Sequence, residues 1–369
     1  MSVEPLKAPF PYFGGKSTVS ADVWVRFGDV RNYVEPFFGS GAMLLNRPQP
    51  FEGSETVNDK DGLVSNFWRA VQAAPDDVAF HADWPVNEND LHGRHVWLVG
   101  EKDSLQTRLD GDPEFFDAKV AGWWCWGMCC WIGSGFCSGN GPWRSVADAE
   151  GVRQLVHVGT AGQGVNRKLV HVGDAGKGVN RKRVHVGNAG QGEDQGTPGR
   201  ESTASESTLG TPGRTDGIYS WMQELSTRLK RVRVCSGDWS RVCGPSVTVK
   251  HGLTAVFLDP PYADSAGRQA DLYREDSSTV AHAVREWAIQ WGDDPRMRIA
   301  LCGYDGEHLM PESWTVFDWK ARGGYGSQGD DDEAAGRANS KKERIWFSPH
   351  CLKPSRETQR PLFAMGDAT

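Results

Sequence analysis

The sequence has no long hydrophobic run. Its longest mostly apolar stretch, residues 122–136, is interrupted by glycines and is shorter than the roughly 20 residues that a membrane-spanning helix needs. The first ten residues, MSVEPLKAPF, lack the apolar core of a secretory signal. With a mean hydropathy of −0.53, these absences predict a cytoplasmic protein with no membrane partner.

Cysteine and positive charge are also in short supply. Eight cysteines in 369 residues are far fewer than a disulfide-stapled secreted domain carries, so we expect reduced thiols. The chain has 41 Lys and Arg against 48 Asp and Glu, a formal net charge of −7. That balance excludes a uniformly basic nucleic-acid coat, although it allows a local basic face.

Positive charge is concentrated in residues 151–183, which hold seven Lys and Arg against the single Asp174. The segment belongs to a 14-residue tandem repeat, marked by His157, His171 and His185. Each unit has one short strand signal followed by Gly-rich turns, too little apolar material to bury a core. We therefore interpret residues 155–215 as a flexible or hairpin-forming insertion, either a solvated linker or a DNA-contacting arm.

The flanks of the chain alternate short β-type runs with helix-like segments. The runs are 33–35, 55–58, 232–235, 255–258, 299–302 and 345–347, and the clearest helical segments are 61–73 and 278–291. This alternation predicts an α/β fold with a mostly parallel sheet, whose ligands bind at the carboxyl ends of the strands. We expect the chemistry to lie directly after those strands.

An acid and a Gly-rich turn follow the first strand, in YVEPFFGSGAMLL (33–45). The turn lacks the third glycine of a dinucleotide fingerprint and the lysine of a P-loop, so pyrophosphate binding is not supported. Glu35 would instead suit a positively charged ligand, such as the sulfonium and ammonium groups of S-adenosyl-L-methionine (AdoMet). The alternative is a tight turn that only packs a helix on the sheet.

Two further acids follow the second strand. Asp59 ends that strand and could accept hydrogen bonds from a ribose diol. We expect Asp61 to be the N-cap of the helix that follows.

The most specific pattern is AVFLDPPYAD, in which a buried strand ends in Asp259-Pro260-Pro261-Tyr262. Two prolines hold the loop rigid, so the Asp259 carboxylate, the Pro260 carbonyl and the Tyr262 ring converge on one point. Two acceptors on the N–H groups of an exocyclic amine would draw its nitrogen toward tetrahedral geometry, while the ring stacks on the base. A merely stiffened turn is the alternative.

Together these motifs resemble the Dam-like, AdoMet-dependent DNA adenine N6-methyltransferases, a family with many phage members. The matching strings, in the family's order, are PFPYFGGK (9–16), EPFFGSG (35–41), Asp59, GDW (237–239) and DPPY (259–262). The resemblance covers residues 1–75 and 220–350, which would form the two parts of a Rossmann-like methyltransferase domain. Residues 76–219 would be an inserted target-recognition region, and 351–369 a tail.

The resemblance implies a role for each motif. Beside the cofactor and target pocket would lie Tyr12, Phe13, Gly14, Gly15 and Lys16. Around the methionine part of AdoMet would lie Glu35, Pro36, Phe37, Gly39, Ser40 and Gly41. Asp59 would bind the ribose, and Asp238 would accept from the cofactor's adenine, with Trp239 against its ring. Asp259, Pro260, Pro261 and Tyr262 would bind and activate the target adenine.

The resemblance implies site-specific methylation of double-stranded DNA, in a bacterial or phage-infected cell, with a restriction nuclease as a candidate partner. The target adenine must leave the duplex, at a cost of a few kcal/mol. Three alternatives remain: methylation of cytosine N4, methylation of an RNA adenine, and a catalytically inactive DNA-binding relative. Related enzymes that act on cytosine N4 more often have Ser at the position of Asp259. Oligomeric state stays open.

Two further groups of residues are candidates for binding. The Trp- and Cys-rich segment 122–143 has no paired C-x2-C spacing and no His, so we expect core packing of an aromatic helix and no metal there. The alternative is that its loop, residues 133–143, enters a DNA groove or fills the gap left by the flipped base. Phosphate contacts could come from basic residues of the repeats and of STRLKRVRV (226–234), where a solvated helix end is the alternative. The candidates are Arg167, Lys168, Arg181, Lys182, Arg228 and Arg231.

Overall fold

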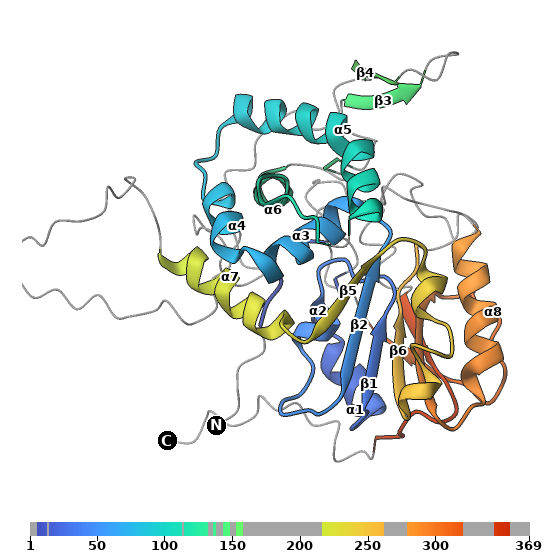
Figure 1. Ribbon diagram of the computed structural model, residues 1–369. Helices are drawn as coiled ribbons and strands as arrows, with labels where there is room; N and C mark the ends of the chain where they lie inside the picture. Colours follow the sequence, from blue (N-terminus) through green and yellow to red (C-terminus); the bar gives the residue numbers. More distant parts are fainter. Residues whose placement is uncertain are drawn as a thin grey trace, which may run out of the picture.

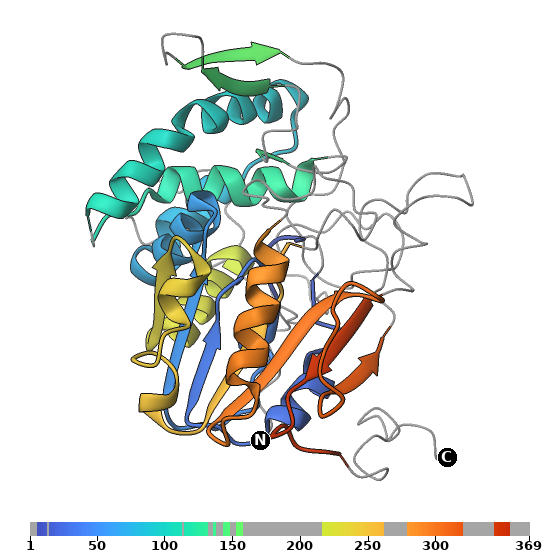
Figure 2. The same ribbon diagram turned by 90° about the vertical axis from the view of Figure 1, so that its right-hand side faces the viewer.

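The computed structural model describes residues 6–12, 15–112, 114–131, 136–137, 143–147, 153–157, 216–261, 279–319 and 343–354. Figure 1 shows a twisted sheet flanked by helices, with a second group of helices beyond one end of the strands. The turned view in Figure 2 shows the same two parts, with helix α8 (Val280–Gly292) lying against one face of the sheet.

The sheet has seven strands in the order β5-β2-β1-β6-β7-β9-β8. Their bounds are β1 Asn32–Glu35, β2 Ser54–Asp59, β5 Val232–Ser236, β6 Thr254–Leu258, β7 Met297–Tyr304, β8 Thr315–Asp318 and β9 Glu343–Phe347. The first five in the order pair in parallel, whereas β9 runs antiparallel to both neighbours. The predicted mostly parallel α/β sheet is confirmed, and all six predicted strands are present. The prediction missed β8, a short edge strand that is largely exposed and so lacks an apolar signal.

Helices cover both faces of this sheet. They are α1 Ser20–Phe27, α2 Ala42–Leu45, α3 Gly62–Ala73, α7 Asp216–Leu229 and α8 Val280–Gly292, with two 3-10 turns, η2 Trp239–Val242 and η3 Val249–His251. The Asp61 carboxylate accepts a hydrogen bond from the backbone N–H of Leu63 at 2.8 Å, which confirms it as the N-cap of α3.

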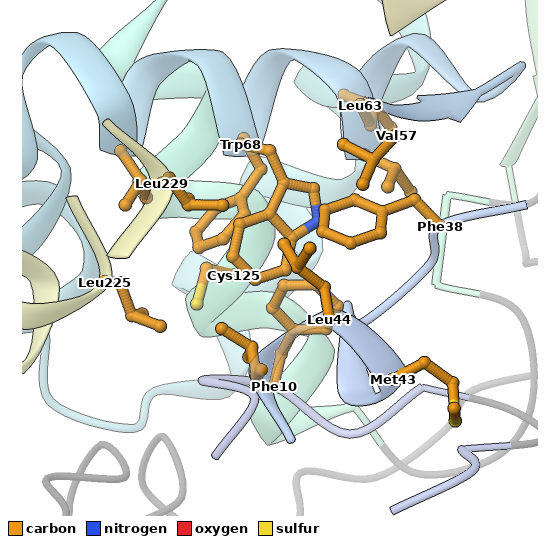
Figure 3. Packing of buried hydrophobic residues seen from close by; sticks show 14 of the residues in the cluster. Phe10, Phe38, Met43, Leu44, Val57, Leu63, Trp68, Cys125, Leu225 and Leu229 are labelled. Atoms are coloured by element: carbon orange, nitrogen blue, oxygen red, sulfur yellow. The ribbon is translucent and has the colours of Figure 1, made fainter. Parts of the chain in front are cut away.

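Two hydrophobic clusters hold these layers together. Side chains alternate along a strand, so Ala255 and Phe257 of β6 join the larger cluster under α1, α3 and α7, while Val256 and Leu258 join the smaller one under α8. Figure 3 shows the larger cluster, in which Trp68 of α3 packs near Leu229 of α7 and near Cys125 of a further helix, α6 (Ala118–Cys130). The sheet and the second group of helices therefore share one core.

The second group consists of α4 Pro75–Ala82, α5 Glu88–Gly111 and α6 Ala118–Cys130. The Trp- and Cys-rich helix α6 is buried along most of its length, as the core-packing interpretation predicted. It approaches α4 closely at Gly122, where a Cβ atom would lie 2.4 Å from the Cβ of His81. All eight cysteines are free, and seven of them are buried. None of the described helices is long and apolar enough to cross a membrane.

A two-stranded antiparallel hairpin, β3 Trp143–Ala147 with β4 Arg153–His157, lies beside α5 (Figure 1). The last three residues of β4 are the Leu-Val-His that begins the first repeat unit, so the start of that unit lies in a hairpin strand. The second and third units, with Arg167, Lys168, Arg181 and Lys182, lie outside the described residues.

Candidate functional site

A cavity opens where the strand order reverses. From β1 the sheet grows in one direction through β2 and β5, and in the other direction through β6 and β7. The loops that leave β1 and β6 therefore run to opposite sides and leave a crevice at the carboxyl ends of these strands. The cavity has a volume of about 890 Å³, including the part that opens to solvent.

The cavity gathers most of the residues that the sequence motifs singled out. Those lining it are Tyr12, Gly15, Lys16, Glu35, Pro36, Phe37, Gly39, Ser40, Asp59, Asp238, Trp239, Asp259 and Pro261. Gly41 and Pro260 stand directly beside lining residues without lining the cavity themselves. Phe13, Gly14 and Tyr262 lie outside the described residues. Five motifs spread over some 250 positions of the sequence thus line one cavity, although their individual roles stay predictions.

The Gly-rich turn brings the N-terminal segment against the cavity. Gly39 has φ +48°, and a Cβ atom there would lie 2.6 Å from the Cε1 atom of Tyr12. Gly41, with φ +69°, ends the turn and precedes α2. Glycine is therefore required at position 39, both for its backbone conformation and for the approach of the Tyr12 ring.

Two polar residues at the end of β2 join three loops of the site. Asp59 accepts from the backbone N–H of Gly39 with one carboxylate oxygen and from that of Asp61 with the other, both at 2.9 Å. The Asn58 amide donates to the carbonyls of Pro36 at 3.0 Å and Gly237 at 2.9 Å. Sequence reasoning missed Asn58. The only signal was an amide one position before the end of a strand, and the sequence does not show that this amide is buried.

Glu35 is buried at the end of β1 and lines the cavity. Burial raises the pKa of its carboxyl well above the usual range, and the negative charge of Asp259 adds to the increase. Hydrogen bonds from the Tyr33 hydroxyl, at 2.8 Å, and from the backbone of Leu44 act in the opposite direction on that pKa. A positively charged ligand would find an acid here that ionises in response to it.

Asp259 follows β6 and is paired with Lys16. The Lys16 ammonium lies 2.8 Å from Oδ2 of Asp259, and its side chain is only 3% exposed. Cys302 of β7 lies behind the pair and forms a hydrogen bond with Asp259. Burial raises the pKa of the Cys302 thiol far above its ordinary value, and the charge of Asp259 adds to this effect. The thiol is therefore a neutral support for the carboxylate, not a nucleophile.

Aromatic rings form another side of the cavity. The rings of Phe37 and Trp239 lie nearly parallel, at 27° with centroids 6.4 Å apart, and Trp287 meets Trp239 edge-on at 6.3 Å. Asp238 is exposed and accepts from the backbone N–H of Ser240 at 3.0 Å, which starts η2. An apolar wall with a carboxylate at its rim suits a planar heterocycle that carries an amino group.

Arg228, a candidate for a phosphate contact or a solvated helix end, is instead paired with a buried acid. Both of its terminal nitrogens bind Glu55, at 2.7 and 2.8 Å, and its side chain is 11% exposed. Glu55 lies near the start of β2, so the pair sits at the opposite edge of the sheet from the cavity. Arg231 is exposed but precedes β5 at that same distant edge. The prediction was based on a cluster of basic residues in the sequence. That cluster does not show that one member, Arg228, pairs with the buried Glu55.

Comparison of the chain with protein-family models and with curated proteins finds no match. Among the described residues, no group of three or more His, Cys, Asp or Glu side chains could hold a metal ion. The chemistry of the cavity and the order of its motifs are therefore the features that indicate a function.

Proposed function

We propose that the protein transfers a methyl group from AdoMet to the N6 amino group of an adenine in double-stranded DNA. The observation that carries the proposal is the convergence of Glu35, Asp59, Asp238 and Asp259 on one cavity at the reversal point of the sheet. The five parallel strands follow the order of doubly wound nucleotide-binding sheets, which supports a Rossmann-like methyltransferase domain.

The residues of the cavity fit AdoMet, which when bound supplies a methyl group already activated on a sulfonium. Glu35, ionised by a cation, would compensate the positive charge of the methionine part. Asp59 would accept from the ribose hydroxyls, because a carboxylate oxygen that takes one backbone N–H can accept a second hydrogen bond. Trp239 and Asp238 would hold the base by stacking and by accepting from its amino group.

Asp259 and Pro260 would hold the target base. The strand β6 is buried along its whole length, and the two prolines that follow it fix the direction of the loop. The Asp259 carboxylate and the Pro260 carbonyl are two acceptors for the two N–H groups of an exocyclic amine. Accepting both would localise the nitrogen lone pair and direct it away from the ring, which is the change that methyl transfer requires.

The direct test is to incubate the purified protein with labelled AdoMet and unmethylated plasmid DNA, and to identify methylated nucleosides after digestion. N6-methyladenine supports the proposal. N4-methylcytosine, or label only in RNA, would replace the substrate with one of the alternatives. AdoMet binding without a methylated base would favour an inactive DNA-binding relative.

We expect AdoMet to bind more tightly as pH rises, because a cation favours the ionised form of Glu35 and the folded protein holds its proton unusually strongly. Below the raised pKa of Glu35, binding should release a proton. Titration calorimetry in two buffers with different ionisation enthalpies measures this release. In Glu35→Gln the proton release and that part of the pH dependence should vanish, and affinity should fall; a variant with wild-type pH dependence would contradict the role.

We also expect residues 155–196 to contribute phosphate contacts, because they hold six Lys and Arg against three acids on a chain whose net charge is −7. Deleting them should weaken DNA binding and flatten its dependence on salt, by about 0.9 in logarithmic slope for each phosphate that is no longer neutralised. Fluorescence anisotropy with a DNA duplex at a series of salt concentrations would measure the slope. An unchanged slope would leave the repeats as a linker.

A further inference from the structure

One part of the site has no counterpart in the sequence motifs, namely the group of side chains behind Lys16. Oε2 of Glu343 lies 3.7 Å from the Lys16 ammonium, and the Trp319 ring centroid lies 5.7 Å from it. Glu343 is 10% exposed and does not line the cavity. Lys16 thus stands between Asp259, which faces the cavity, and Glu343, which lies behind.

The antiparallel strand β9 explains why Glu343 is there. The parallel strands all end on the side of the sheet where the cavity lies. The strand β9 runs in the opposite direction, so it begins on that side, and its first residue lies there. Glu343 is that residue, and it pairs with Tyr304 at the end of β7. A carboxylate therefore sits behind the loop after β6, far from any catalytic motif in the sequence.

We infer that Glu343 is a positioning residue that holds the Lys16 ammonium and thereby keeps Asp259 ready to accept the target amine; this inference rests on the proposed function. A buried ammonium needs a compensating charge. The described residues place two carboxylates within 4.0 Å of Lys16, those of Asp259 and Glu343, so a loss of Glu343 would shift the compensation toward Asp259. The incoming amine would then compete with Lys16 for the same oxygen.

Charge points in the same direction. Asp259, Glu343 and Lys16 together carry one net negative charge, facing an amine that becomes positive as it takes up a methyl group. Neutralising Glu343 would remove that net charge, so the transition state would lose stabilisation that the bound ground state does not need. The substitution should therefore lower kcat and leave AdoMet binding nearly unchanged, because Glu343 does not reach the cavity.

The test is Glu343→Gln in the full chain. We expect kcat for methyl transfer to fall about 10- to 100-fold, while AdoMet affinity measured by calorimetry stays within about twofold. The matched control is Asp318→Asn, which removes a carboxylate from the neighbouring strand β8 that is 71% exposed and pairs with Arg344 instead of Lys16. It should leave kcat unchanged.

A measurement without cofactor checks the contact itself. Thermal midpoints of the wild type, Lys16→Met, Glu343→Gln and the double variant should be non-additive, with the double variant less destabilised than the two single shifts predict. Additive shifts, a wild-type kcat in Glu343→Gln, or a fall in kcat that follows from weaker AdoMet binding would each overturn the inference. A wild-type protein that methylates no nucleic acid would overturn the proposed function, and the positioning role with it.

Discussion

Asp259→Ala should reduce methyl transfer by about 10³-fold or more and leave AdoMet binding largely intact. The carboxylate is the charged acceptor of the Asp259-Pro260 pair, and it lies on the loop after β6. The acids proposed to hold AdoMet lie elsewhere: Glu35 and Asp59 end β1 and β2, and Asp238 follows β5. The two functions are therefore separable. Single-turnover transfer to DNA and calorimetric titration with AdoMet measure them independently.

Asp259→Asn is the companion variant, because it keeps the size of the side chain and one acceptor oxygen while removing the charge. In both variants Lys16 keeps Glu343 as a carboxylate neighbour at 3.7 Å, so the fold should survive. We expect Asp259→Asn to lose activity nearly as far as Asp259→Ala if the charge matters most. Near-normal turnover in either variant would remove Asp259 from the mechanism.

The sequence predicted the sheet and the composition of the cavity well, for a physical reason. Buried parallel strands are continuous apolar runs, and in such a sheet the residues after them must meet at one edge. Glu35, Asp59 and Asp259 could therefore be placed together from local patterns alone. The positions of Tyr12 and Lys16 depended on the family resemblance, because no local rule brings the N-terminal segment to that edge.

What sequence reasoning missed depends on long-range pairing. Glu343 lies 84 positions after Asp259, and only the direction of β9 brings it behind Lys16. Cys302 was predicted only to be a reduced thiol, because its hydrogen bond to Asp259 crosses from β7 to the residue after β6. Arg228 looked like a phosphate ligand because its partner, Glu55, is 173 positions away. An ion pair between distant strands leaves no spacing signal.

The largest effect on stability should come from Glu55→Gln, at about 3–5 kcal/mol of the free energy of unfolding. The Glu55 side chain is 2% exposed and binds two guanidinium groups, Arg47 at 3.0 Å and Arg228 at 2.7 Å. Removing its charge leaves both cations buried without compensation. Burial already lowers the pKa of Arg47, and the charge of Glu55 opposes that decrease. Without Glu55, water would therefore stabilise the Arg47 charge only weakly.

Urea unfolding measures this change, and Asp318→Asn is again the matched control, since its ion pair with Arg344 has an exposed carboxylate and should contribute less than about 1 kcal/mol. Equal, small effects of the two substitutions would show that Glu55 does not hold the fold. The ion pair of Glu55 with Arg228 also lies at a point where the path of the chain has to be fixed. Arg228 ends α7, where the chain returns to the sheet after the repeats, and it also donates to the carbonyl of Leu44 at 2.9 Å. Because this network fixes the point of return, we expect variants with fewer or more repeat units to keep the cavity at the other end of the strands unchanged.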